Sequence, residues 1–131
     1  MANEAVLVFE TELPIPMTCS STTAMEKGIV LKLSDPFTAA QQTALNDVVA
    51  GINAVELLNP NSGKAAVYRG GIFKMVASGS IAVGEAVVTA TSNKVVAAVV
   101  NNENILGIAL ETASDGESLL VELRPTVMNL A

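Results

Sequence analysis

The chain has 131 residues, of which 50% are hydrophobic and 15% are charged, and its formal net charge is −6. This length suits one domain with a core of its own. A soluble domain usually has about 25% charged residues, so the shortfall predicts that other chains cover part of the exterior. We therefore expect a protein that acts within an oligomer or a larger assembly.

Residue types that carry much of catalysis and metal binding are scarce. The chain has no histidine, and Cys19 is its one cysteine. These counts exclude a disulfide within the chain, a zinc site of the Cys/His type and a His-based catalytic triad. Without an imidazole to activate it, Cys19 is interpreted as a small, partly buried residue rather than a nucleophile. We expect no enzyme, no metal and no cofactor.

Partners with extended charged or apolar surfaces are also disfavoured. The seven basic residues stand singly along the chain, and there are three Phe, one Tyr and no Trp. Without a basic stripe or a row of aromatic rings, we expect no nucleic-acid binding. The longest apolar run, residues 95–100, is too short to cross a bilayer, and the acidic residues before Lys27 do not fit a secretory signal. No membrane partner is expected.

In chain order, the first feature is the strand-like run Ala5 to Phe9, of which Val6, Leu7, Val8 and Phe9 are the residues expected to bind a partner. Pro14 and Pro16 follow; they fix φ and remove backbone donors, which predicts that this part stays out of a central strand ladder. Residues 1–25 are interpreted as an extended N-terminal arm whose strand-like run adds to the sheet edge of a partner. An ordinary first strand followed by a long loop fits the same residues.

The body, residues 26–131, reads as short apolar runs separated by Gly, Ser, Asn and Pro clusters. This pattern is typical of a small antiparallel β-barrel or sandwich-like domain, so the expected fold class is all-β. Residues 38–47 are expected to form a loop with at most one short helical turn. Pro125 is expected to end the last strand. The predicted strands are 29–34, 48–58, 65–68, 72–76, 86–91 and 118–124, with turns at 59–63, 78–80, 101–104 and 113–116.

Six glycines are expected to form structural turns, bulges or close backbone approaches: Gly28, Gly51, Gly71, Gly84, Gly107 and Gly116. Four of them also suggest an internal duplication of residues 27–58 as residues 83–112. Gly84 and Gly107 follow Gly28 and Gly51 at the same offset of 56 positions, as Val87 follows Leu31 and Ile108 follows Ile52. Few other identities accompany this pattern, so coincidence is the alternative.

Two further motifs invite a chemical interpretation. Glu111, Asp115 and Glu117 cluster before the last strand, but their spacing matches no calcium loop, so turn formation and solvation are the preferred explanations. A single Arg-Gly-Gly at residues 69–71 is interpreted as a bend between two strands rather than an RNA-binding motif.

Five segments carry a family resemblance: KGIVLKLSDP (27–36), VAGI (49–52), YRGGIF (68–73), VGEAV (83–87) and LGIALET (106–112). Together they resemble the head (capsid) decoration proteins of tailed bacteriophages, over residues 27–124. The resemblance implies a small β-rich protein that sits on the outer surface of the expanded capsid and cements neighbouring capsomers. Such proteins usually occur as three copies together.

The resemblance also implies the partners, which are the major capsid protein of the same phage and other copies of the chain in a homotrimer. Such a protein is made in the host cytoplasm and ends on the outer capsid surface of the virion. In several of these families an N-terminal arm lies on the capsid, which fits residues 1–25, although no resembling segment falls within them.

Three alternatives from other classes stay open. A receptor-binding or head-fibre module needs an exposed recognition surface. A small enzyme is disfavoured by the missing histidine. A non-viral assembly subunit with the same β fold has the same composition.

Overall fold

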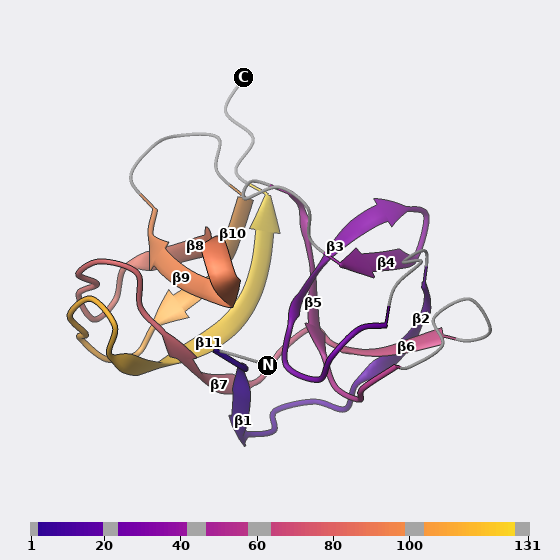
Figure 1. Ribbon diagram of the computed structural model, residues 1–131, viewed down its shortest axis with the longest axis horizontal. Coiled ribbons are helices and arrows are strands. Elements are labelled where there is room, and N and C mark those ends of the chain that lie inside the picture. The colour runs from indigo at the N-terminus through magenta and orange to yellow at the C-terminus, as the bar shows by residue number, and fades with distance from the viewer. Residues whose placement is uncertain (1–2, 20–23, 42–46, 58–63, 99–103, 128–131) are drawn as a thin grey trace.

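The computed structural model describes residues 3–19, 24–41, 47–57, 64–98 and 104–127 (Figure 1). These residues form strands and one short 3₁₀ turn, η2 (Thr91–Asn93), which confirms the all-β fold class. No helix in these ranges is long and apolar enough to span a bilayer. The strands are β1 (Val6–Phe9), β2 (Ile15–Cys19), β3 (Val30–Asp35), β4 (Thr38–Gln41), β5 (Val49–Asn53), β6 (Lys64–Tyr68), β7 (Ile72–Val76), β8 (Ala86–Ala90), β9 (Lys94–Ala97), β10 (Asn104–Ala109) and β11 (Ser118–Val127).

The first half of the chain forms a closed barrel in the order β2-β4-β3-β5-β6, drawn in purple and magenta in Figure 1. Strands β2 and β4 pair in parallel, while the other neighbours are antiparallel. The interior holds Met17, Met25, Leu31 and Val67, all nearly fully buried. Flexible methionine side chains fill an irregular interior well, because they have three rotatable bonds.

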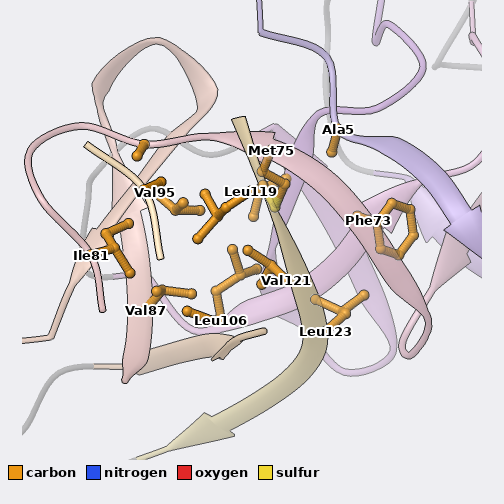
Figure 2. Packing of buried hydrophobic residues seen from close by; sticks show 14 of the residues in the cluster. Ala5, Phe73, Met75, Ile81, Val87, Val95, Leu106, Leu119, Val121 and Leu123 are labelled. Atoms are coloured by element: carbon orange, nitrogen blue, oxygen red, sulfur yellow. The ribbon is translucent and has the colours of Figure 1, made fainter. Parts of the chain in front are cut away.

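Strands β7 to β11 of the second half, together with β1 from the N-terminal segment, form a six-stranded sheet in the order β1-β7-β11-β10-β8-β9, which lies beside the barrel. Phe73 and Met75 of β7 point inward while Lys74 is exposed, as the alternation of the sequence predicted. Figure 2 shows this core running from Phe73 and Leu123 at one end to Ile81 and Val95 at the other. Apolar burial of this kind contributes most of the stability of a small β domain.

The two halves repeat one pattern of strand pairing. In the first, Val30 pairs with Ile52 and Leu31 with Gly51; 56 positions later, Ala86 pairs with Ile108 and Val87 with Gly107. The neighbouring pairs keep the same offset: Leu31–Gln41, Lys32–Ala40 and Leu33–Ala39 correspond to Val87–Ala97, Val88–Val96 and Thr89–Val95.

The correspondence extends to the remaining strands. The isolated bridge between Met25 and Leu57 recurs as Ile81 with Ala113. Strands β2 and β6 pair antiparallel as β7 and β11 do. We therefore call β2–β6 (Ile15–Tyr68) the first repeat and β7–β11 (Ile72–Val127) the second repeat, and infer that the predicted duplication of 27–58 and 83–112 is part of this larger one.

The N-terminal segment belongs to the body rather than to a separate arm. Within residues 3–19, β1 pairs with β7, and β2 lies between β4 and β6 in the barrel. The expectation that Pro14 and Pro16 keep this part out of a ladder is therefore wrong. The prolines are tolerated because β4 pairs with β2 only from Thr18 onward, so no donor is needed earlier on that edge. The alternative of an ordinary first strand describes this segment better.

Two other expectations need correction. Residues 38–41 form strand β4 instead of a loop, because Thr38, Ala39 and Ala40 are buried in the barrel wall and tertiary packing overrides weak helical propensity. Strand β11 also continues past Pro125 to Val127. The pairing with β10 shifts register between Ile105 and Gly107, opposite this proline, and a bulge does not require its missing N–H.

The predicted turns have different outcomes. Bends and turns occur at Ser78–Gly79 and at Asp115–Gly116. The turn expected at 59–63, most of that at 101–104, and residues 42–46 lie outside the described part of the chain. Among the described residues, the one short helical turn is η2, and most of the segment 38–47 in which a turn was expected beyond β4 lies outside them.

Candidate binding surface

Strand β1 places three of its four apolar side chains on the surface. Val6, Val8 and Phe9 are 49%, 42% and 59% exposed, while Leu7 packs against the main core. Large apolar side chains on an edge strand are a liability unless a partner covers them. These are the four residues expected from the sequence to bind a partner, and the structure brings them together on one short strand.

The inner side of β1 is anchored to the body. Ala5 is buried, and its N–H donates to the carbonyl of Gly28 at 3.0 Å. Leu7 pairs with Phe73 of β7, and the side chains of both residues lie close to Gly71. A Cβ at Gly71 would lie only 3.2 Å from the Phe73 ring and 3.4 Å from Leu7. The strand is therefore held in a fixed position rather than hanging free.

The outer edge of β1 remains open. β1 stands at one end of the strand order, so among the described residues no strand pairs with its second edge. Its pairing with β7 shifts register between Leu7 and Phe9, a local irregularity that is common at sheet edges. The opposite end strand, β9, differs because Val95 forms a parallel bridge with Ala77. Among the described residues, the second edge of β9 is therefore partly paired, whereas that of β1 is not.

The chain just after β1 is fixed by a hydrogen bond and a ring contact. The Tyr68 hydroxyl donates to Oε2 of Glu10 at 3.0 Å. Partial burial, with smaller contributions from this hydrogen bond and from the charge of Glu10, raises the pKa of Tyr68 above its usual value. The Tyr68 ring also meets Phe73 edge-on, with centroids 5.6 Å apart. These contacts connect the exit of β1 to both repeats.

The six glycines expected at turns and bulges occupy constrained places. Gly28, Gly51, Gly71, Gly84 and Gly116 have positive φ angles. Gly107 does not, but a Cβ there would overlap the carbonyl oxygen of Glu122, as a Cβ at Gly51 would overlap that of Tyr68. Gly51 and Gly107 lie 56 positions apart, at corresponding positions of the two repeats, so each repeat requires glycine at this position.

The acidic cluster before β11 is used by the turns. Asp115 Oδ1 accepts from the N–H of Gly79 at 2.8 Å, and Glu117 Oε1 accepts from the N–H of Ser114 at 2.7 Å. Glu111 Oε1 accepts from the N–H of Leu120 at 3.0 Å. In the described ranges, no group of three or more acidic or cysteine side chains could hold a metal ion. Cys19 is half-buried, with its Sγ 3.9 Å from Sδ of Met25.

One connecting residue had no signal in the sequence. Asn93, at the end of η2, has φ +59 and reaches across to the first repeat. Its Oδ1 accepts from the N–H of Val30 at 3.0 Å, and its Nδ2 donates to the carbonyls of Asn3 and Gly28 at 3.0 and 2.9 Å. These partners lie 63 to 90 positions away, beyond any local pattern.

Two kinds of known protein are similar to this chain. Among solved structures, the fold is similar to the crystal structure of the head fibre gp8.5 N base of bacteriophage phi29. The TM-score is 0.57 and the identity 15%, and the match covers 88% of this chain and 98% of that one. At this identity the likeness shows a shared fold. No curated protein sequence matches the chain. Residues 10–125 match the family model of phage cement proteins, and because this match spans most of the chain, the protein belongs to the phage cement protein family.

Proposed function

We propose that the protein binds the outer surface of an expanded tailed-phage capsid and cements neighbouring capsomers there, as a homotrimer. The observation that carries this proposal is the match of residues 10–125 to the phage cement proteins. The partner is the major capsid protein of the same phage. The role is structural and requires no nucleophile, metal or cofactor.

The open edge of β1 is the proposed capsid contact. A capsid strand that aligns with this edge forms backbone hydrogen bonds with β1, and neighbouring pockets receive its exposed side chains. Val6, Val8 and Phe9 supply apolar area that is now in water. Because Ala5 and Leu7 anchor the other side of the strand, little ordering entropy is lost on binding.

The proposed stabilisation is passive. A protein that binds only the expanded lattice shifts the equilibrium toward that lattice by mass action, and the gain grows with its free concentration relative to Kd. The low share of charged residues is consistent with apolar surface that capsid and sister subunits cover. Net negative charge suits an outer face that has no contact with packaged DNA.

The contact is tested by a charge on the edge strand. Val8→Lys puts an ammonium group on an exposed β1 position, a device by which natural sheets block strand addition. Binding of the purified variant to heads that lack the protein should weaken at least about tenfold, or about 1.4 kcal/mol. Removing residues 1–25 is unsuitable, because it deletes barrel strand β2.

The matched control is Val55→Lys, at a position that is 61% exposed and outside β1. It should bind heads as the unmodified protein does. Equal binding by the Val8 variant, with both variants folded, would show that β1 is not the capsid contact.

A second candidate function is the base of a head fibre or a receptor-binding module. The similarity to the phi29 head fibre base favours it. A binding assay on host cells and on their surface glycans distinguishes the two functions. Cell or glycan binding by the free protein would support the receptor function, whereas binding to heads alone supports cementing.

A further inference from the structure

We propose that Pro14 and Pro16 close one edge of strand β2 to strand addition, and so direct an added strand to the edge of β1. The strand they exclude from β2 is the N-terminal strand of a second copy of this chain. The block acts without a capsid and goes beyond the proposed function. Its basis is the comparison of β2 with β7, the strand in the same place of the second repeat.

Strands β2 and β7 correspond with an offset of 58 positions. On the edge away from β6, Cys19 pairs in parallel with Ala39 of β4. The corresponding edge of β7 carries the parallel bridge between Ala77 and Val95 of β9. Ala77 follows Cys19 by the offset of 58, and Val95 follows Ala39 by the 56 positions that relate the strand pairs of the two repeats. The two edges are therefore equivalent.

In the second repeat, a strand covers the first part of this edge. By the same offset, positions 14–16, at the start of β2, correspond to positions 72–74 of β7. Strand β1 pairs with all three of these β7 residues, Ile72, Phe73 and Lys74. A strand in this place gives the backbone groups of the edge their hydrogen-bond partners. The edge of β7 thus accepts an added strand, and β1 fills it within the chain.

In the first repeat, proline occupies two of the three corresponding positions. Neither Pro14 nor Pro16 has an N–H. Pro16 pairs with Ala66 of β6, and a proline fits this ladder position because its nitrogen points away from β6. Backbone groups of successive strand residues point to alternate sides, so the nitrogen of Pro14 points the same way. The two positions whose N–H groups would face an added strand are the two that lack an N–H.

This stretch of edge is accessible as well as unpaired. Strand β4 pairs with β2 only at Thr18 and Cys19, so among the described residues no strand pairs with Pro16 on that side. Pro16 is exposed, and Leu13 beside it is 74% exposed. An exposed edge next to apolar side chains promotes pairing between chains, and proline is one means by which natural sheets prevent it. The strand excluded is β1 of another copy, because β1 fills the equivalent edge of β7.

The test restores both N–H groups in the double variant Pro14→Thr, Pro16→Thr. The probe is a fluorescently labelled peptide of residues 3–9, NEAVLVF, and its binding to the folded protein is measured by fluorescence anisotropy. The double variant should bind this peptide at least about tenfold more tightly than the unmodified protein does, because threonine favours strands and supplies the missing donors. The assay contains no phage heads, so its result is independent of the capsid role.

Pro36→Thr is the control, in the exposed turn between β3 and β4. It removes a proline without adding an N–H to a strand edge, so the peptide should bind it as it binds the unmodified protein. Thermal unfolding checks that each variant is folded. If the double variant does not fold, Pro16→Thr alone replaces it, because Pro16 is exposed. Folded β2 variants that bind the peptide no more tightly than the unmodified protein would overturn the inference.

Discussion

At the scale of single residues, the titration of Tyr68 reports directly on its contact with Glu10. It is the only tyrosine and the chain has no tryptophan, so the ultraviolet absorbance of tyrosinate follows one group. Its hydroxyl donates to Glu10, and partial burial, then this hydrogen bond and the negative charge, raise its pKa above the usual value near 10. The protonated phenol is therefore favoured by the folded state.

We predict that Glu10→Gln lowers the pKa of Tyr68 toward its usual value, while the neighbouring Glu12→Gln leaves it unchanged. Because the folded pKa is raised, the stabilisation is fully present below the unfolded pKa, near pH 10, and is lost as the pH rises through the folded pKa. A spectrophotometric titration of the tyrosinate absorbance measures the pKa of Tyr68 in each variant. An unchanged titration in Glu10→Gln would mean that Glu10 does not contact Tyr68 in solution.

At this scale, the sequence predicted which residues of the N-terminal run lie on the surface, but not which residues make contacts far apart in the chain. The run Ala5 to Phe9 was found because five consecutive apolar residues stand between Glu4 and Glu10, and the structure exposes Val6, Val8 and Phe9 to water. The contact between Tyr68 and Glu10 joins residues 58 positions apart, and no local pattern encodes it. The constrained backbone at the six glycines could be predicted, because glycine is the residue type that most readily adopts positive φ and permits close backbone approach.

At the scale of secondary-structure elements, Asn93 of η2 makes a second prediction. Its side chain makes three hydrogen bonds to the backbone of residues 3, 28 and 30. Asn93→Gly keeps the left-handed backbone without strain and removes only these bonds. At about 1 kcal/mol for each bond, the free energy of unfolding should fall by about 2–3 kcal/mol.

The matched control is Ser92→Gly, next in the chain and also at positive φ, with an exposed side chain. It should change the free energy of unfolding by less than about 0.5 kcal/mol. Denaturant unfolding measures both variants. Equal stability of the two would show that Asn93 does not hold the repeats together.

Strands were predicted correctly where short, regular apolar runs mark them, and were missed where only pairing with neighbouring strands makes the segment a strand. Strands β3, β6, β7 and β8 lie within a residue or two of their predicted positions. Strand β4 was missed because TAAQ has no β-forming pattern and is a strand only through its pairing with β3 and β2. The prolines in β2 and β11 led to wrong predictions of where these strands lie. A strand tolerates proline where its edge has no pairing partner, as in β2, or where the ladder has a bulge, as in β11.

At the scale of the whole molecule, the sequence predicted the internal repeat but not how the two repeats pack against each other. Four glycines at a constant offset of 56 positions predicted the duplicated register that the strand pairs display. How one repeat packs against the other depends on side chains such as Val30 and Ile52, which the sequence alone could not distinguish from interior residues.

The central claim is that this protein binds the expanded phage head and stabilises it. The most direct measurement is co-sedimentation of the purified protein with heads of its own phage that lack it, using expanded shells and unexpanded precursors side by side. We predict saturable binding to expanded shells and none to precursors. Equal binding to both, or binding to neither, would contradict it.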